Sequence, residues 1–397
     1  MGQDSLRIQH WLADLATYQA NLEARHMNLY HTISQTEFES TLQTIKAQLS
    51  QLTDDEIIIQ LKTLTRKIGD GHTALPLWGM SYSVYPIEVL PFGNEWRVIK
   101  TLPMYKHLLG KKLIQIGALS IDQAVAKIAP ICQFVENRHS LKARIPNYLR
   151  IAEVLHTLNM SSQKNQAQFT FSNDQGKKIM VSMNAMPNEH YNQAQLEQIT
   201  PTASVKKPED QTLESIWFAP IANTEAIYLK FSSYPSFEEM NAFGQQLLGY
   251  ITAKQKRQLI IDFRGNYGGD FFIGLVLASY LNLADCIDWQ SGVYVLTDRF
   301  TFSAAMNNAA HFRQILHGKI IGEPTGGNPY GYQDMGQFEL PNSGLTVTYS
   351  KRFFRFQDQP SEGIQPDVPL EVTWEKYATG ADEVLEWVMK DLGNQQP

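Results

Sequence analysis

A single serine separates an apolar run from an alanine-rich segment in the stretch YVLTDRFTFSAAM, residues 294–306. The run before it predicts a buried strand, and the segment that opens with Ala304 predicts a helix. Ser303 is therefore expected where a strand ends and a helix begins, beside backbone N–H groups that the helix leaves unbonded. A serine there can cap the helix, in which case its loss costs about 1 kcal/mol. It can also act as a nucleophile, provided that a base and oxyanion donors are near.

Two other loops contain the residue types that such a nucleophile requires. The stretch GDGHTAL, residues 69–75, places His72 among glycines, and imidazole is the commonest general base. The stretch IIDFRGNYGGD, residues 260–270, ends an apolar run in Gly268 and Gly269, where backbone N–H groups can approach a ligand closely. The same loop could cradle a phosphate, but it lacks the lysine of a P-loop and does not fit GxGxxG. Each signal is weak alone, because caps, exposed histidines and plain turns are common.

Composition limits the classes of function. The 397 residues are 43% hydrophobic and 19% charged, which predicts a soluble globular protein of two or three domains. The formal net charge of -6 argues against nucleic-acid binding and against a membrane-surface role. No window is long and apolar enough to predict a transmembrane segment. The amino terminus shows no signal peptide, so localisation stays open: extracytoplasmic if a signal was trimmed, and otherwise cytoplasmic.

No metal or other cofactor is expected. The chain has no HExxH motif or clustered ligand set, and two cysteines are too few for a disulfide framework or a cysteine-rich zinc site. Whether Cys132 and Cys286 pair is not decided by the sequence. His26 and His31 are five residues apart in a predicted helix and would not share a face, so they are interpreted as surface or packing residues.

The periodicity predicts helices first and strands later. Residues 1–68 repeat apolar side chains every three or four positions, with Ser34 as a helix cap, and Gly69 is the expected end of that region. From residue 75 the pattern favours strands, and residues 188–211 are polar, which predicts a linker or surface excursion. Beyond it, strand and helix patterns alternate from AIYLKF, residues 226–231, to a final helix. That alternation predicts an α/β layered core.

Five stretches, taken together and in this order, resemble the serine peptidases related to tail-specific (C-terminal processing) proteases and to the tricorn core. They are GDGHTAL, LIIDFRGNYGGD, VYVLTDRFTFSAA, IIGEPTGG and EGIQPDVPLE. The resemblance implies an α/β fold with a ClpP/crotonase-like core of strand-strand-helix units, an N-terminal helical region and a PDZ-like insertion. The expected domains are a helical region at 1–70, a strand-rich region at 71–200 with the PDZ-like module near 80–135, and the peptidase core at 201–397.

The family uses two catalytic schemes, and two departures in this sequence favour the same one. The Ser-Lys scheme takes its base from a segment in which Asn328 stands here at the position of the lysine. An amide does not accept a proton usefully. The tricorn-like scheme takes its base from a GHT-type histidine, which here is His72. The resemblance therefore implies that Ser303 attacks the carbonyl while His72 acts as the general base.

A carboxylate should orient His72 in that scheme. Glu362 is the matching acid, and Asp358 is the second choice, because relatives differ in register here. A serine that tricorn-like members place before the histidine is missing, since that residue is Gly71. The implied oxyanion donors are the backbone N–H groups of Ala304 and of Gly268 or Gly269.

Three acids and bases outside this set are given structural roles. Asp262 and Arg264 are expected to anchor the end of their strand, and Asp367 is expected to cap or fix a turn.

Three functions are compatible with these residues. The first is a serine peptidase that acts on peptides or unfolded proteins. The second is a non-catalytic binding protein on the same fold that holds a peptide or a hydrophobic ligand, but the intact Ser303 and His72 favour the enzyme. The third is an esterase-like acyl hydrolase, which the absence of a G-x-S-x-G elbow disfavours. The oligomeric state and the natural substrate are left undecided.

Overall fold

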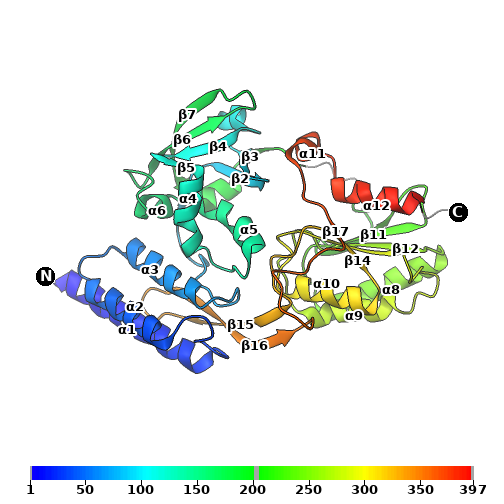
Figure 1. The fold of residues 1–397 in the computed structure, drawn as a ribbon, viewed down its shortest axis with the longest axis horizontal. Helices are drawn as coiled ribbons and strands as arrows, with labels where there is room; N and C mark the ends of the chain where they lie inside the picture. The colour runs from blue at the N-terminus through cyan, green and yellow to red at the C-terminus, as the bar shows by residue number, and fades with distance from the viewer. Residues whose placement is uncertain (1, 201–204, 395–397) are drawn as a thin grey trace. The chain divides into compact units, whose positions relative to one another are not determined.

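The computed structural model describes residues 2–200 and 205–394, and the chain folds into two compact units. The first unit consists of Met1–Glu136, Leu141–Ile199 and Gly331–Phe354. The second consists of Asn137–Ser140, Thr200–Tyr330 and Arg355–Pro397. Figure 1 labels the elements of both units. Each unit is thus assembled from segments that are far apart in the sequence.

Helices open the first unit, as the periodicity predicts: α1 (Gly2–Arg25), α2 (Gln35–Gln48) and α3 (Asp54–Lys67). The Ser34 hydroxyl caps α2 by accepting from the backbone N–H of Glu37 at 3.1 Å. Thr53 and Glu56 form a capping box at the start of α3. Gly69 follows α3 with a φ of 92°, a left-handed conformation that glycine adopts readily and that ends the helix.

An antiparallel sheet occupies the middle of the first unit, in the order β2-β3-β4-β6-β7, with β5 beside β4 and β9 beside β3. Its strands are β2 (Ile87–Phe92), β3 (Glu95–Thr101), β4 (Lys112–Ile116), β5 (Leu119–Ser120), β6 (Gln166–Ser172), β7 (Lys178–Asn184) and β9 (Glu197–Gln198). Two short strands pair separately, β1 (Ser83–Val84) with β8 (Met186–Pro187). The helical segments along this stretch are η1 (Pro103–Leu108), α4 (Ile121–Ile128), η2 (Ala129–Ile131), α5 (Arg138–Tyr148), α6 (Ala152–Thr157) and α7 (Asn188–Gln193). The expected linker at 188–211 therefore begins with the short helix α7 and the strand β9.

A late ribbon completes the first unit. Strands β15 (Tyr330–Glu339) and β16 (Thr346–Arg355) pair with each other. The backbone of Thr348 in β16 bonds Ala74 in both directions, at 3.3 and 2.8 Å. Leu340, Leu345 and Val347 enter the core of α1, α2 and α3. The sequence predicts β16 as a strand, but it does not predict the second backbone partner of this strand, because Ala74 lies 274 residues before Thr348.

The second unit is an α/β layer built on a six-stranded sheet in the order β10-β11-β12-β13-β14-β17. Its first pair is antiparallel and the others are parallel. The strands are β10 (Ile216–Pro220), β11 (Ala226–Phe231), β12 (Gln258–Asp262), β13 (Val293–Thr297), β14 (Lys319–Gly322) and β17 (Val368–Pro369). The helices are α8 (Phe237–Ala253), α9 (Phe271–Leu281), α10 (Ala304–Ile315), α11 (Trp374–Thr379) and α12 (Glu383–Asn394).

Two apolar clusters cover the faces of this sheet. On one face, side chains of β11, β12 and β13 pack with α8, α9 and α10. On the other, Tyr228, Ile260 and Tyr294 pack with Val384 and Val388 of α12. The alternation of strand and helix that the sequence predicts is present, and α8, α9 and α10 are the connections between successive parallel strands.

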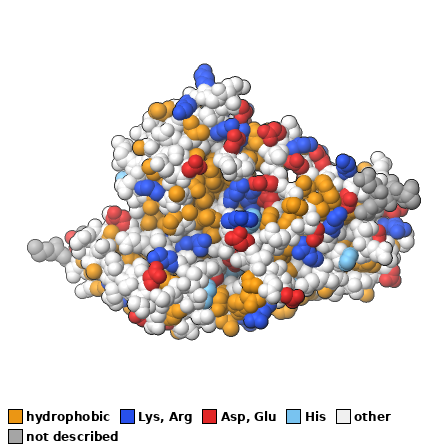
Figure 2. All heavy atoms as spheres, in the orientation of Figure 1, with side chains coloured by type: hydrophobic (Ala, Val, Ile, Leu, Met, Phe, Trp, Pro, Cys, Tyr) orange, Lys and Arg blue, Asp and Glu red, His pale blue; other side chains and the backbone are white. Residues whose placement is uncertain are grey.

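Charges of both signs are mixed on the surface. On the face drawn in Figure 2, Lys and Arg side chains lie among Asp and Glu side chains, with hydrophobic side chains between them. Within the described residues, no helix is long and apolar enough to cross a membrane. Both cysteines are free: Cys132 is buried in the first unit and Cys286 is partly buried in the second.

Candidate active site

Ser303 lies between β13 and α10 with a backbone conformation that is rare for serine. Its φ is 52° and its ψ is -127°. Its side chain makes no capping hydrogen bond to the helix. A non-glycine residue in this region carries strain of about 1–3 kcal/mol, and such strain persists where the surrounding structure imposes it. The capping role that was open from the sequence is therefore not the one that Ser303 has.

The loop that carries Ser303 is tied to the segment after β12. The partly buried carboxylate of Asp298 accepts from the backbone N–H of Gly265 at 3.1 and 3.0 Å and from that of Thr301 at 2.9 Å. The backbone N–H of Phe302 donates to the carbonyl of Asn266 at 3.0 Å. These bonds set the position of Ser303 relative to the glycine turn.

The surroundings of Asp298 shift its pKa upward despite these hydrogen bonds. Burial raises its pKa to about 6, and the charge of Glu323 acts in the same direction. The backbone N–H of Gly265 opposes this shift by bonding the carboxylate. The tie between the two loops therefore contains a group that changes charge at mildly acidic pH.

Gly268 approaches the serine so closely that only glycine fits. A Cβ atom at this position would lie 2.7 Å from the Cβ of Ser303 and 2.9 Å from the backbone nitrogen of Ala304. Its φ is 105°. Its backbone N–H already donates to the side chain of Asn266 at 2.9 Å. Ala304 is the first residue of α10, where N–H groups precede the intrahelical ladder. Gly268, one of the three expected oxyanion donors, thus already donates to another acceptor.

His72 lies in the first unit, in the loop after α3, and is 4% exposed. Its backbone N–H donates to the carboxylate of Asp70 at 3.0 Å. Its Nδ1 lies 3.1 Å from Oε1 of Glu136, and both side chains are 5% exposed. A buried carboxylate at Nδ1 leaves Nε2 as the nitrogen that can take a proton from a nucleophile. Sequence reasoning missed Glu136, although it is the only acid between Asp122 and Glu153.

Glu362, the expected orienting acid, is half-exposed in the second unit. Its carboxylate lies 3.3 Å from Nε of Arg138, and the two side chains are 57% and 74% exposed. An ion pair this exposed contributes little to stability. Asp358, the second choice, is also exposed. The carboxylate that the structure places beside His72 in its own unit is that of Glu136.

Asn328, which stands where the family has a lysine, has a structural role. Its Oδ1 accepts from Nδ2 of Asn137 at 2.8 Å and from the backbone N–H of Gly363 at 2.9 Å. The amide therefore binds two separate segments of the second unit together, and a lysine could not accept these bonds.

Asp262, Arg264 and Asp367 make contacts that are consistent with the structural roles expected of them. Asp262 is buried against Arg264, which also pairs with Asp382 at 2.7 Å. Burial alone would raise the pKa of Asp262, but the charges of Arg264 and Lys230 hold it below its usual range. Asp367 accepts from the backbone N–H of Ile320 at 2.7 Å and so joins the turn before β17 to β14.

One cluster of possible metal ligands occurs among the described residues: His26, His31 and Asp70, with ligand atoms within 4.8 Å of one another. The helical placement of the two histidines was wrong, because α1 ends at Arg25, both lie in the turn that follows, and their rings stack; their interpretation as surface or packing residues is not contradicted. Nδ1 of His26 accepts from the backbone N–H of Asn28 at 2.9 Å, so its Nε2 carries the proton and donates to Asp70 at 3.0 Å. A metal ion bound to Nε2 would require the ring proton to be on Nδ1. The Nδ1–H group would then face the N–H of Asn28, and two donors would oppose each other. The donor set fits a hydrogen-bonded pair rather than a metal site.

Comparison with known proteins finds a family model that matches part of the chain. Residues 278–370, which include Ser303, Asn328 and Glu362, match the model of peptidase family S41. The matched segment makes the chain similar to a family of serine-type peptidases.

Solved structures are similar to this chain in their fold. The mature form of CPAF complexed with lactacystin is 11% identical, with a TM-score of 0.68, over 98% of this chain and 100% of that chain. Mature CPAF is 12% identical, with a TM-score of 0.67, over 99% of each chain. The photosystem II D1 C-terminal processing protease also matches, at 13% identity over 91% of this chain and 93% of that chain, with a TM-score of 0.42.

Proposed function

We propose that this protein is a serine peptidase of the S41 type, which hydrolyses peptide bonds through attack by Ser303, with His72 as the general base and with peptides or unfolded proteins as substrates. The observation that carries the proposal is the backbone of Ser303, held at a φ of 52° with no capping bond from its side chain. A serine on a strained turn between a strand and a helix presents its hydroxyl outward for reaction. His72 and Ser303 belong to different units, and catalysis requires that the two side chains meet.

Glu136 is the carboxylate that we assign to the orientation of His72. The distance of 3.1 Å between Nδ1 and Oε1 and the burial of both groups support it. A carboxylate in this place holds the imidazole in the reactive tautomer and stabilises its charged form when it takes the serine proton. Glu362 and Asp358 are the alternatives that the family resemblance suggests.

The oxyanion of the tetrahedral intermediate is assigned to the backbone N–H groups of Ala304 and Gly269. The start of α10 supports Ala304, because a helix N-terminus offers unbonded donors and a favourable dipole. We assign Gly268 to the wall of the oxyanion site rather than to its donors. Its close approach to Ser303 leaves no space for a side chain, and its N–H donates to Asn266.

Two finer features of the fold belong to the same proposal. The parallel strands and connecting helices of the second unit support a ClpP/crotonase-like core. The short strands β2 to β5 with helix α4, residues 87–128, support a PDZ-like module near residues 80–135.

A fluorophosphonate probe tests the nucleophile. We expect the probe to label the protein at Ser303, because a serine activated by a base and facing oxyanion donors forms a stable phosphonyl adduct. Ser303→Ala and His72→Ala should each abolish labelling, and Ser303→Ala should abolish peptide cleavage. A folded protein that neither reacts with several probes nor cleaves any peptide would instead be the non-catalytic binding protein. Lactacystin, the ligand of the CPAF structure, provides a second reagent for the same serine.

Variants of the three acids test the orienting role. Glu136→Gln should lower kcat by about 10²–10⁴-fold with little change in melting temperature, because the wrong tautomer of His72 is then favoured. Glu362→Gln and Asp358→Asn are the matched controls and should retain most of the activity. The reverse pattern would move the role to Glu362 or Asp358.

A further inference from the structure

The loop that carries His72 is held by one buried carboxylate, that of Asp70. Its Oδ1 accepts from the backbone N–H groups of His72 at 3.0 Å and Thr73 at 2.7 Å. The same oxygen accepts from the hydroxyl of Ser350 in β16 at 2.6 Å. Its Oδ2 accepts from Nε2 of His26 at 3.0 Å. Three segments of the first unit therefore meet at this side chain.

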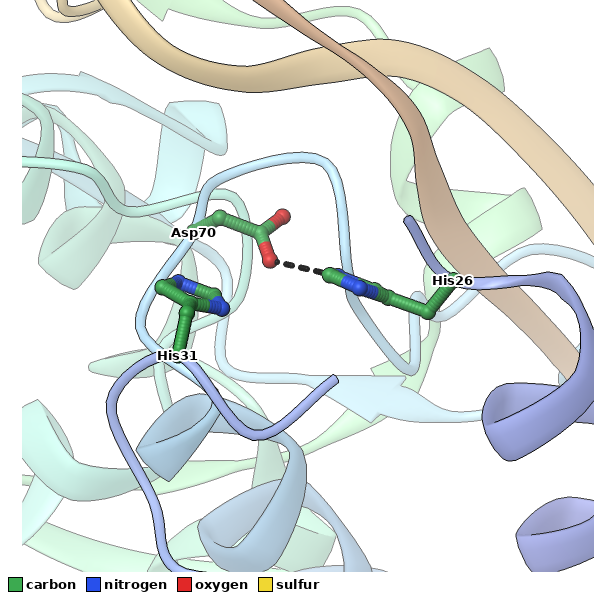
Figure 3. Close-up of side chains that lie close together, drawn as sticks. All are labelled: His26, His31 and Asp70. Atoms are coloured by element: carbon green, nitrogen blue, oxygen red, sulfur yellow. Dashed lines mark hydrogen bonds and ion pairs between the residues drawn. The ribbon is translucent and has the colours of Figure 1, made fainter. Parts of the chain in front are cut away.

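His26 is fixed as a donor toward this carboxylate. Its Nδ1 accepts from the backbone N–H of Asn28 at 2.9 Å, which leaves the ring proton on Nε2. Figure 3 shows Nε2 directed at Asp70, with the ring of His31 beside the pair. The rings of His26 and His31 stack with centroids 5.8 Å apart, and the centroid of the Tyr332 ring lies 4.2 Å from that of the His31 ring. The side chain of His26 is fully buried, so the ring has little freedom to turn.

The backbone around the pair is also constrained. A Cβ atom at Gly69 would lie 2.6 Å from Oγ1 of Thr32, which places the turn after α1 directly against the His72 loop. The backbone N–H of Met27 donates to the carbonyl of Ser350 at 3.0 Å. Burial would raise the pKa of Asp70, but the bonds from His26 and Ser350 outweigh it and bring the pKa to about 2. Asp70 is therefore an anion at neutral pH.

We propose that His26 and Asp70 form a positioning pair, which fixes the backbone of the His72 loop and so sets where the imidazole of His72 stands. The proposal rests on the proposed function and deepens it. His26 and Asp70 touch no reacting atom, and they act through the two N–H groups at His72 and Thr73. A displacement of about 1 Å in a catalytic group can cost 10²-fold in rate, so a tie of this kind affects kcat more than substrate binding.

Four variants of the full chain test the pair by kcat and KM for a peptide substrate. In Asp70→Asn the amide oxygen can still accept from His72, but the amide nitrogen faces the Nε2–H of His26, and two donors then oppose each other. We expect kcat to fall about 10–100-fold while KM changes less than about twofold. In the double variant Asp70→Asn/His26→Gln, the amide oxygen introduced at position 26 can accept from the amide nitrogen introduced at position 70. This variant should recover at least about tenfold of the lost kcat. Asp122→Asn and His107→Gln, two exposed residues of the same unit, are the matched controls and should behave as wild type.

Two measurements keep the test independent of folding and of the proposed function. If Asp70→Asn does not fold, Ser350→Ala and His26→Gln, which each weaken one bond to Asp70, should still lower kcat without raising KM. NMR of the protein labelled with ¹⁵N at histidine should show His26 as the Nε2–H tautomer, whether or not the protein is active.

Each contrary outcome has one meaning. Normal kcat in folded Asp70→Asn overturns the proposal, and so does an Nδ1–H tautomer at His26. A loss of melting temperature and kcat that the double variant does not recover would make the pair merely structural, which also overturns it. A wild-type chain without any Ser303-dependent turnover overturns the proposed function, and the catalytic role of the pair with it, whereas failure of the pair alone leaves wild-type turnover intact.

Discussion

Ser303 shows how a single backbone conformation separates two roles that the sequence leaves open. Both a cap and a nucleophile require a serine at the start of α10, so its position does not distinguish them. The left-handed φ of 52° and the missing capping bond do. A residue that only capped the helix would gain nothing from this strain, whereas a nucleophile gains a hydroxyl that the turn presents at the start of the helix.

Ser303→Gly should therefore stabilise the protein and abolish its activity. Glycine adopts a positive φ without strain, so we expect the free energy of unfolding to rise by about 1 kcal/mol. Ser303→Ala should lack this gain and should also lack the cost of a lost cap. Urea denaturation of the three proteins measures the difference. Equal stability of the glycine variant and wild type would mean that the backbone at this position is not strained.

The close approach of Gly268 to Ser303 predicts that a side chain at this position lowers activity more than the strain of its backbone alone would. In Gly268→Ala the new Cβ would meet Ser303 and Ala304, so we expect kcat to fall by about 10²-fold or more. Gly265→Ala is the matched control, because Gly265 has a φ of 76° and an added Cβ there has nothing within 4 Å. Both variants carry the strain of a positive φ, but only Gly268→Ala crowds the serine. Equal losses of activity in the two would contradict an active-site role for Gly268.

At the scale of elements, the ends of β12 and β13 are held together by Asp298, whose pKa predicts a pH dependence. The pKa is about 6 in the folded protein and 3.8 is its ordinary value. Between these values the folded state keeps a proton that the unfolded state has released. Unfolding then releases a proton, and the free energy of unfolding falls as the pH rises from about 4 to about 6.

Asp298→Asn should flatten that part of the stability profile. We expect the slope between about pH 4 and pH 6 to become less negative, as measured by chemical denaturation at several pH values. Asp70 acts in the opposite direction, because its pKa of about 2 gives stability that is present above 3.8 and lost as the pH falls toward 2. Asp70→Asn should therefore change the slope of the profile only below about pH 4, and at higher pH it should lower the free energy of unfolding by a constant amount. An unchanged slope in Asp298→Asn would show that Asp298 is not the group responsible.

At the scale of the whole molecule, the order of segments makes the two units interdependent. The first unit takes β16 and most of β15 from residues 331–354, which follow most of the second unit in the sequence. Leu340, Leu345 and Val347 in this region are at most 4% exposed, within the core of the amino-terminal helices. A cut near residue 199 would remove all three from that core.

A fragment of residues 1–199 is therefore expected to fold poorly. Each of these three side chains contributes about 1.5–3 kcal/mol when buried, and their sum approaches the whole stability of a typical domain. The fragment should bind the dye ANS and unfold without a sharp transition. Joining residues 331–354 to it through a Gly/Ser linker should restore a cooperative transition. A fragment that unfolds cooperatively without the ribbon would contradict this account.

The sequence by itself determined the features that depend on neighbours along the chain. The helices of residues 1–68, the alternating strands and helices after residue 226, and the loops of His72 and Ser303 follow from local periodicity and turn chemistry. The order of the motifs was enough to indicate a resemblance to a serine peptidase family, and the model of such a family matches residues 278–370.

Only the tertiary structure decided which side chains stand beside these loops. Glu136 beside His72, and His26 and Ser350 around Asp70, have no signature in their own segments. Their partners are 44 residues away for His26 and 280 for Ser350. A helical spacing rule failed for His26 because the helix ends one residue before it. Contacts of this kind depend on how distant segments pack, and no local pattern of residues encodes that packing.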